Sequence, residues 1–385
     1  MEETIYNLFN VINLNLSKPL KKTLVQLITC LLENNKAHLC KLGEELAVDG
    51  PSKNACVQRI RRFLSNKRIT PSLTIVPLIY LMRPLLESLP EIILSMDRTE
   101  WKKRDKWINI LSVAVCYKGR ALPLFWMVFG RKGNSALENW KDVLTPVIEG
   151  LQRMDWLSDK PIHVVADREF TSPKLAEWLK KIYAVGSTLR IKSSMYLNEE
   201  NKPEMKVASL IQNMKKGSRI ILRNQTLTRD SSFKMNVLLT WKKKYDEPLV
   251  VATTSDKPFL SDETYGKRFG IECMHKDWKS NAFDLEKTRV TDSKRIETLL
   301  IPIAFAYAFC MLEGERKEKF HDDIRKPPKG KTRMTGLFLD GLRNIARHLR
   351  RADIDQFKMF IFNLLKSFFK KWNIQPYTIL DMVDR

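Results

Sequence analysis

The fold is decided by residues 91–129, which read EIILSMDRTEWKKRDKWINILSVAVCYKGRALPLFWMVF. Three apolar runs follow one another in this segment, at 92–96, 107–117 and 121–129. Only Lys118-Gly119-Arg120 separates the second run from the third, as in a β-hairpin. The segment therefore predicts three consecutive β-strands.

The residues that follow predict alternating helices and strands. An amphipathic helix is predicted at 137–154, a buried strand at 162–166, and a further helix from Ser172-Pro173 onward. The resulting order is β-β-β-α-β-α, with more strands and then helices downstream. This order is typical of a ribonuclease-H-like α/β fold. We therefore predict an α/β core of that class, with a β-rich insertion and helical N- and C-terminal regions.

The pattern of apolar, basic and turn-forming residues along the chain predicts five regions. Short alternating stretches at 219–222 and 235–239 indicate a β-rich insertion, after which 249–253 returns to the main sheet. A basic, proline-containing joint is predicted at 325–331. The predicted regions are a helical N-terminal region at 1–85, the first part of the core at 86–184, the insertion at 185–248, the second part of the core at 249–315, and a basic helical C-terminal region at 316–385.

The charge balance points to a polyanionic partner. The 385 residues include 67 Lys and Arg against 44 Asp and Glu, which gives a net charge of +23, more than solubility requires. An apolar content of 44% suffices for a buried core, so most of the chain is expected to be ordered. The apolar run at 299–312 contains Pro302 and is shorter than the roughly 20 residues of a membrane span, so we expect a core helix and no membrane partner.

The sequence also favours a reducing compartment. Its six cysteines form no Cys-x2-Cys pair, so neither a disulfide framework nor a zinc ribbon is indicated. The first residues, Met1-Glu2-Glu3-Thr4, lack the basic and apolar regions of a secretory signal. We therefore expect a protein that is not exported.

A basic helix is predicted near the N-terminus. Ser52 is a suitable N-cap for a helix at 53–66, in which an apolar stripe lies beside basic side chains. With a short helix at 41–46 before it, the segment resembles a helix-turn-helix, whose second helix binds in a DNA groove. A helical hairpin with a solvated basic face explains the pattern equally well. The side chains that would contact DNA are Lys53, Arg59, Arg61 and Arg62.

Two predicted strands are followed by an aspartate. Asp97 comes after the apolar residues 92–96, and Asp167 comes after 162–166. The carboxyl ends of strands in an open α/β sheet form the crevice where ligands bind, so the two carboxylates are expected to face each other. They would repel unless a cation lay between them, and oxygen ligands suit Mg²⁺ or Mn²⁺. The alternative for either aspartate alone is that it begins a turn.

A stripe of charged and polar side chains is predicted on one helix at 262–280. At 100° per residue, its four members project within about 60° of one another. Ile271, Met274 and Trp278 lie on the opposite side, which is expected to pack against the core. One carboxylate between two cations and a phenol suits a phosphodiester site, and a solvated charge stripe is the alternative. The four residues are Tyr265, Arg268, Glu272 and Lys279.

Three motifs together resemble a known family. The spacing Tyr-x2-Arg-x3-Glu-x6-Lys at 265–279 resembles the signature of a cut-and-paste subgroup of bacterial insertion-sequence transposases with a DDE catalytic triad. Asp97-Arg98-Thr99-Glu100-Trp101 resembles the first-aspartate motif of that group, and Asp167-Arg168-Glu169-Phe170 resembles the second. The motifs occur in the same order as in the group, and the β-rich insertion lies between the second aspartate and the glutamate, as it does there.

The resemblance implies a DNA transposase. Asp97, Asp167 and Glu272 would be its catalytic residues and would hold two Mg²⁺ ions, with Mn²⁺ as a substitute. Tyr265, Arg268 and Lys279 would grip the DNA backbone beside the scissile phosphate. The implied reaction cuts the ends of an element, passes through a DNA hairpin and joins the ends to target DNA. The implied partners are double-stranded DNA, at the terminal inverted repeats and the target, and a second copy of the chain as a homodimer, in the bacterial cytoplasm at the nucleoid.

Hairpin formation requires an extruded base, and in relatives a tryptophan of the insertion stacks on it. Leu249 stands where this side chain is expected, which leaves Trp241, eight residues earlier, as the candidate. An ordinary packed or surface aromatic is the alternative for Trp241.

Two other functions use the same residues. A catalytically idle relative would bind DNA as a repressor or architectural protein, and a ribonuclease-H-like nuclease would cut without joining. The intact triad disfavours the first, and the basic N-terminal helices and the basic tail disfavour the second, because holding specific DNA ends requires such surfaces.

Overall fold

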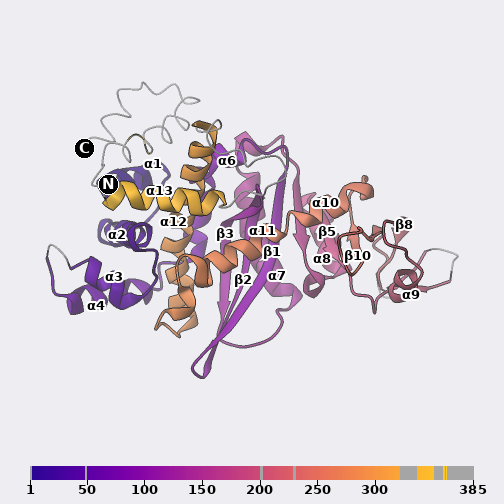
Figure 1. Cartoon of the computed structure of the whole chain (residues 1–385), viewed down its shortest axis with the longest axis horizontal. Helices are drawn as coiled ribbons and strands as arrows, with labels where there is room; N and C mark the ends of the chain where they lie inside the picture. The colour runs from indigo at the N-terminus through magenta and orange to yellow at the C-terminus, as the bar shows by residue number, and fades with distance from the viewer. Residues whose placement is uncertain are drawn as a thin grey trace.

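The computed structural model describes residues 2–47, 50–199, 203–228, 231–320 and 336–350, together with Met359 and Ile361. Helices of the N- and C-terminal regions lie together at one end of the molecule, and the sheet extends from them toward the other end (Figure 1). The basic joint predicted at 325–331 and most of the predicted C-terminal region lie outside the described residues.

The described residues form an eight-stranded mixed sheet in the order β3-β2-β1-β4-β5-β10-β9-β8. β1 is parallel to β4, and β4 is parallel to β5, whereas the other neighbours are antiparallel. The α/β class and the three consecutive strands at the N-terminal end of the sheet are confirmed. The strands are β1 Ile92–Lys103, β2 Lys106–Tyr117, β3 Arg120–Phe129, β4 Ile162–Ala166, β5 Gly186–Arg190, β8 Arg219–Gln225, β9 Met235–Thr240 and β10 Leu249–Thr253.

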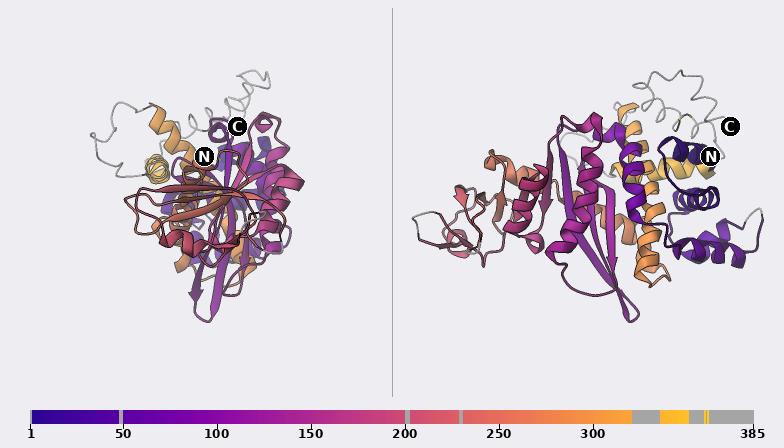
Figure 2. Two further views of the ribbon diagram at one scale, coloured as in Figure 1. Left: turned by 90° about the vertical axis from the view of Figure 1, so that its right-hand side faces the viewer. Right: turned by 180° about the vertical axis from the view of Figure 1, so that it is seen from behind.

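Helices cover both faces of this sheet and form the bundle at one end (Figure 2). The predicted start of α8 is confirmed, since the Ser172 hydroxyl accepts a hydrogen bond from the backbone N–H of Leu175 at 3.4 Å. The short strands β6 Tyr196–Leu197 and β7 Met205–Lys206 pair with each other. The helices are α1 Glu2–Val11, α2 Lys18–Asn34, α3 Leu39–Glu45, α4 Lys53–Leu64, α5 Ile75–Leu81, α6 Arg83–Leu86, α7 Leu137–Gln152, α8 Pro173–Tyr183, α9 Val207–Gln212, α10 Ser261–Gly266, α11 Phe269–Lys276, α12 Ser293–Phe320 and α13 Leu337–Arg350.

β1 does not end before its aspartate, which corrects the sequence prediction. Its parallel pairing with β4 stops at Met96 opposite Ala166, but its antiparallel pairing with β2 continues to Lys103 opposite Lys106. The hairpin partner therefore keeps β1 extended after β4 has ended. Asp97 lies within a long strand, whereas Asp167 directly follows a short one.

The region predicted as a β-rich insertion contributes to the main sheet. β5 lies beside β4 as a central strand, although its first residue, Gly186, falls within the region assigned to the insertion. β9 and β8 extend the same sheet through β10 rather than forming a separate one. The cause is long-range pairing, because β10 pairs with β5 on one side and with β9 on the other. The prediction that 249–253 returns to the main sheet is confirmed.

α12 is the central core helix. It is longer than the apolar run at 299–312 predicted, and its length and composition match those of a membrane span, but that apolar stretch is entirely buried inside the protein. α13 crosses α12 so closely that a Cβ atom at Gly314 or Gly341 would overlap the backbone of the other helix. The prediction of a core helix at this position is confirmed.

The N-terminal basic segment forms two short helices. α4 begins after Ser52, whose hydroxyl accepts a hydrogen bond from the backbone N–H of Ala55 at 3.3 Å, as the capping pattern predicts. The apolar stripe of α4 is buried, and Gly43 of α3 packs tightly against Val57 of α4. Both a helix-turn-helix and a helical hairpin fit this arrangement.

The predicted single helix at 262–280 consists of three pieces. α10 ends at Gly266, α11 begins at Phe269, and a π-helical turn at Asp277–Asn281 follows. The bend before α11 means that the four side chains of the predicted stripe do not lie on one continuous helix face. Their apolar counterparts Ile271, Met274 and Trp278 are buried, as predicted.

The contact between α11 and the turn after β2 sets the position of α11, and two glycines test it. Gly270→Ala should destabilise the fold by roughly 1–3 kcal/mol, because a Cβ atom there would overlap the backbone carbonyl of Arg120. Gly266→Ala is the matched control, since a Cβ atom at that position meets nothing within 4 Å. Thermal unfolding of both variants checks the prediction, and equal melting temperatures would contradict the close packing.

Candidate active site

Three carboxylates from distant parts of the chain meet beside one arginine. Asp97 and Asp167 each follow the last parallel pair of β1 and β4, Met96 opposite Ala166, so the two aspartates lie side by side. Glu272 lies on α11, which packs against β1 and β3. The structure thus brings together the three acidic residues that the sequence predicted as the catalytic triad.

The guanidinium of Arg268 supplies the positive charge among these carboxylates. Its Nη1 lies 3.5 Å from Oδ2 of Asp97, and its Nη2 donates a hydrogen bond to Oε1 of Glu272. The side chain is only 11% exposed. Burial opposes its charge, but Tyr265 and the three carboxylates hold the pKa of Arg268 above its ordinary value. Its buried Nε has no hydrogen-bond partner among the described residues.

Asp167 is stabilised in its charged form. Its Oδ1 accepts hydrogen bonds from the backbone N–H of Arg168 at 2.8 Å and from the Tyr265 hydroxyl at 3.0 Å. Nη1 of Arg190 lies 3.7 Å from the same oxygen. Burial alone would raise the pKa of Asp167, but these donors and the charge of Arg268 lower it below its usual value.

Asp97 lies in a less favourable environment for a charge. Burial raises its pKa to about 6, although Arg268 and the backbone N–H of Arg98 partly offset this effect, and the charges of the other two carboxylates add to it. Nδ1 of His275 lies 3.9 Å from Oδ2 of Asp97, and Nε2 of the same ring is 2.7 Å from the Ser112 hydroxyl. Burial lowers the pKa of His275 to about 3, so this imidazole is neutral near pH 7 and does not balance the charge of Asp97.

Lys279 lies at the far side of the acidic cleft. Its Nζ forms an ion pair with Oε1 of Glu286 at 3.0 Å and lies 5.5 Å from the centre of the Trp101 ring. A cavity of about 430 Å³ is lined by residues that include Asp97, Glu272 and Lys279. Lys279 therefore shares a cleft with two of the three carboxylates without contacting them.

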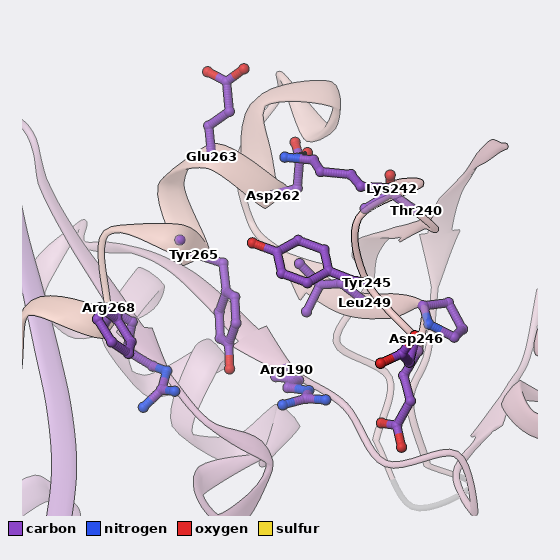
Figure 3. Close-up of a pocket in the computed structure, with 14 residues that line it drawn as sticks. Arg190, Thr240, Lys242, Tyr245, Asp246, Leu249, Asp262, Glu263, Tyr265 and Arg268 are labelled. Atoms are coloured by element: carbon purple, nitrogen blue, oxygen red, sulfur yellow. Dashed lines mark ion pairs between the residues drawn. The ribbon is translucent and has the colours of Figure 1, made fainter. Parts of the chain in front are cut away.

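A second and larger pocket opens on the other side of Tyr265. Its volume is about 680 Å³, and its lining includes Arg190, Tyr265 and Arg268 (Figure 3). Tyr245, which is 52% exposed, contributes an aromatic ring to the same pocket. Because Tyr265 and Arg190 both contact Asp167, the pocket adjoins the acidic cleft.

The predicted base-stacking candidate does not line this pocket, whereas Tyr245 does. Trp241 is half-buried, and its Nε1 donates a hydrogen bond to the backbone carbonyl of Tyr245 at 3.0 Å. Sequence reasoning missed both Tyr245 and Arg190. Tyr245 lies in the turn between two predicted strands, and this position could have identified it. Arg190 ends β5, which is adjacent to β4, and that position could have identified it in the same way.

The basic residues predicted on the N-terminal helix lie apart from the carboxylates, at the end of the molecule occupied by α3 and α4 (Figure 1). Lys53 forms an ion pair with Glu44, and Arg59 donates a hydrogen bond to Oε1 of Gln26 at 2.9 Å. Arg61 and Arg62 are exposed. Of the four, Arg61 and Arg62 present their charges to solvent without a partner among the described residues.

The donor chemistry of the cleft fits a divalent cation. The three carboxylates supply only oxygen ligands, which suit Mg²⁺ and Mn²⁺. In the part of the chain that the structure describes, no group of three or more acidic, histidine or cysteine side chains is close enough to hold a metal ion. The guanidinium of Arg268 contacts two of the carboxylates, those of Asp97 and Glu272.

This acidic cleft, formed by two adjacent parallel strands and a later helix on a mixed sheet, defines a phosphoryl-transfer enzyme with a ribonuclease-H-like fold. A family model described as the transposase DDE domain matches residues 88–309, which is more than half of the chain, and the chain therefore belongs to that family. Membership of this family implies that the protein binds DNA and catalyses phosphoryl transfer in DNA transposition. Enzymes of this family generally use divalent metal ions. No curated protein matches the chain.

The raised pKa of Asp97 predicts a pH-dependent effect on stability. A carboxyl group whose pKa rises on folding favours the fold when protonated, and this contribution is lost as the pH rises through about 6. Asp97→Asn should therefore raise the free energy of unfolding of the metal-free protein by about 1–3 kcal/mol at pH 8, and by much less at pH 4. Urea unfolding at both pH values checks this, and an equal effect at both would contradict it.

Proposed function

We propose that this transposase cuts the ends of a bacterial insertion sequence and joins them to target DNA through a hairpin intermediate. The observation that carries the proposal is the meeting of Asp97, Asp167 and Glu272 around Arg268, within the residues that match the transposase domain. The signature spacing at 265–279 supports assignment to the cut-and-paste subgroup.

Asp97, Asp167 and Glu272 are proposed to hold two Mg²⁺ ions, for which Mn²⁺ can substitute. Bound there, the ions would lower the pKa of an attacking water and neutralise charge on the reacting phosphate. The three side chains suit this role because they converge on one cleft and supply only oxygen ligands. The environment of Asp97, which raises its pKa in the metal-free protein, would become favourable to the charge beside a cation.

Arg268 has a second role in this proposal. In the structure its guanidinium contacts Asp97 and Glu272 and so offsets the repulsion between these carboxylates. Once their charge is neutralised, Arg268 is free to bind a DNA phosphate bidentately, together with the Tyr265 hydroxyl. Arg190 and Lys279 lie on either side of this pair and extend the phosphate contacts into the two pockets.

The proposed reaction consists of in-line displacements at phosphorus. In the first, a water oxygen attacks a phosphodiester at the element end, the bond from phosphorus to the 3′ oxygen breaks, and a 3′-hydroxyl and a 5′-phosphate result. That 3′-hydroxyl then attacks the opposite strand, which closes the end as a hairpin and releases the flanking DNA. Water reopens the hairpin, and the 3′-hydroxyl finally displaces a 3′ oxygen in the target strand. Each attack by a 3′-hydroxyl exchanges one phosphodiester bond for another, and each attack by water breaks one phosphodiester bond and consumes one water molecule.

Tyr245 is the aromatic side chain that we propose to stack on the extruded base of the hairpin. It is half exposed, lines the larger pocket and faces the same space as Tyr265 (Figure 3). A volume of about 680 Å³ accommodates a nucleobase. This assignment replaces Trp241, whose indole N–H is held by the backbone carbonyl of Tyr245.

The wider assignments follow from charge and from the reaction. The net charge of +23 fits binding of double-stranded DNA at both the inverted repeats and the target. The regions 1–85, 86–184, 185–248, 249–315 and 316–385 are retained as functional divisions, with Arg61 and Arg62 as the exposed cations of the DNA-binding N-terminal region. Cleavage of paired ends implies a homodimer on DNA, in the bacterial cytoplasm at the nucleoid.

The direct test is incubation of the purified protein with flanked end DNA of its native element, with and without Mg²⁺, followed by denaturing gel electrophoresis. Metal-dependent nicks, then hairpins, then joined products would support the proposal. Nicks without joined products would instead indicate a nuclease. Tight binding without cleavage in Mg²⁺ or Mn²⁺ would indicate a repressor or architectural protein.

Glu272→Gln should abolish cleavage, because a neutral amide is a poor metal ligand. The dissociation constant for end DNA should stay nearly unchanged, because Glu272 contacts Arg268 and is not part of a basic DNA-binding surface. Gel-shift titration without metal and a cleavage assay with Mg²⁺ measure the two effects. Retained Mg²⁺-dependent cutting would remove Glu272 from the metal site.

Tyr245→Ala should slow hairpin formation by roughly 5- to 150-fold, because stacking an aromatic on a base contributes about 1–3 kcal/mol. The first nick should be unaffected, since it precedes base extrusion. Tyr245→Phe keeps the ring and should restore the rate, and Tyr196→Ala, which removes another exposed tyrosine ring outside the pocket, is the matched control. Single-turnover kinetics of each step distinguish the variants. A hairpin rate that falls with Trp241→Ala but not with Tyr245→Ala would contradict the assignment.

A further inference from the structure

The hairpin of β1 and β2 projects well beyond the rest of the sheet. In all three views its tip extends past the neighbouring strands and helices (Figures 1 and 2). β1 and β2 pair up to Lys103 opposite Lys106, and a two-residue turn joins them. We call residues 102–107 the basic ribbon tip.

The basic ribbon tip carries four cations and one acid. Three of the cations, Lys102, Arg104 and Lys106, are exposed and have no hydrogen-bond or ion-pair partner for their side chains within the described ranges. Lys132, from the segment after β3, adds a further cation above the Trp107 ring at 5.0 Å. The tip is thus an unpaired positive surface of a kind that binds phosphates.

Two features of the tip are unfavourable in the free protein. Arg104 has a φ of +53°, a left-handed conformation in which glycine or asparagine would be less strained. Lys103 and Lys106 lie directly opposite each other in the ladder, where like charges repel, although the Nζ of Lys103 also donates a hydrogen bond to the backbone carbonyl of Glu286 at 2.8 Å. Departures of this kind from local preferences are expected where side chains serve a binding function.

The tip is connected to the acidic cleft by one continuous strand. Asp97 lies within β1, seven residues before Arg104 of the turn, so the turn lies roughly 23 Å from Asp97 at about 3.3 Å per residue. Between them, Lys279 packs over Trp101 at 5.5 Å and lies 3.4 Å from the backbone carbonyl of Glu100. Lys279, which is ion-paired with Glu286, therefore lies beside the ribbon between the cleft and the tip.

We propose that the basic ribbon tip binds the duplex whose strand is cut in the acidic cleft, at a point about 20 Å from the scissile phosphate. A two-stranded β-ribbon fits the major groove, and the exposed cations would reach the phosphates on its edges. This inference rests on the proposed function, since it assumes that DNA is the substrate. It adds a contact surface on the catalytic domain itself, separate from the N-terminal helices and from Tyr265, Arg268 and Lys279.

The test measures the salt dependence of binding to a 30-base-pair duplex of mixed sequence by fluorescence anisotropy, in EDTA so that no cleavage occurs. Each phosphate contact contributes about 0.9 to the slope of log K against log salt concentration. Arg104→Gly should lower the slope by about 0.9, and the triple variant Lys102→Gln, Arg104→Gly, Lys106→Gln should lower it by about 2.7.

Arg104→Gly also separates a binding defect from a folding defect. Glycine relieves the positive φ, so the melting temperature of this variant should equal or exceed that of the wild type while its affinity falls. Arg153→Gly is the control for the loss of one exposed positive charge, because Arg153 is 72% exposed, caps the C-terminal end of α7 and pairs only with Glu149 of the same helix among the described residues. It should leave the slope unchanged.

Three results would overturn the proposal. An unchanged slope in the triple variant would show that the tip does not contact DNA, even if the wild type binds tightly and cuts. An equal loss with Arg153→Gly would show that net charge alone is responsible. A wild-type protein that does not bind the duplex would remove the proposed function and the role of the tip together.

Discussion

The architecture of the site depends on the repulsion between two neighbouring carboxylates. Parallel pairing of β1 with β4 sets Asp97 beside Asp167, and α11 brings Glu272 to the same cleft. Three negative charges in a partly buried space require a cation. The guanidinium of Arg268 meets that requirement, since it contacts both Asp97 and Glu272.

The rest of the fold holds α11 against the sheet, which keeps Glu272 in contact with Arg268. The backbone of Gly270 lies against that of Arg120 at the turn between β2 and β3, where no side chain would fit. Nη1 of Arg120 forms an ion pair with Oδ2 of the buried Asp277 at 3.0 Å, just after α11. Arg120 thus contacts α11 near its start, through Gly270, and just after its end, through Asp277, which leaves the helix little freedom. The catalytic glutamate of our proposal is therefore positioned by residues that never touch DNA.

The sequence predicted the elements whose signals are local. The apolar runs in 91–129, the buried run at 162–166 and the Ser172 cap all depend on residues close in the chain, and each was confirmed. The extension of β1 past Asp97 was not predicted, because it depends on pairing with β2 after β4 has ended. The joining of β8 and β9 to the main sheet likewise follows from long-range pairing. The sequence did not predict the break before α11, because Gly266 and Gly270 leave the helical spacing of the surrounding apolar residues unchanged.

The same distinction applies to the site. The motif spacing predicted the three acidic residues, whereas Tyr245 and Arg190 share a pocket only because β5, β9 and β10 lie side by side in the sheet. The most direct test of the central claim is a crystal structure of the protein with Mn²⁺, recorded at the manganese absorption edge. We predict an anomalous peak between the carboxylates of Asp97, Asp167 and Glu272, with the Arg268 guanidinium moved away from them. An empty cleft with Arg268 still paired, or manganese bound only elsewhere, would contradict it.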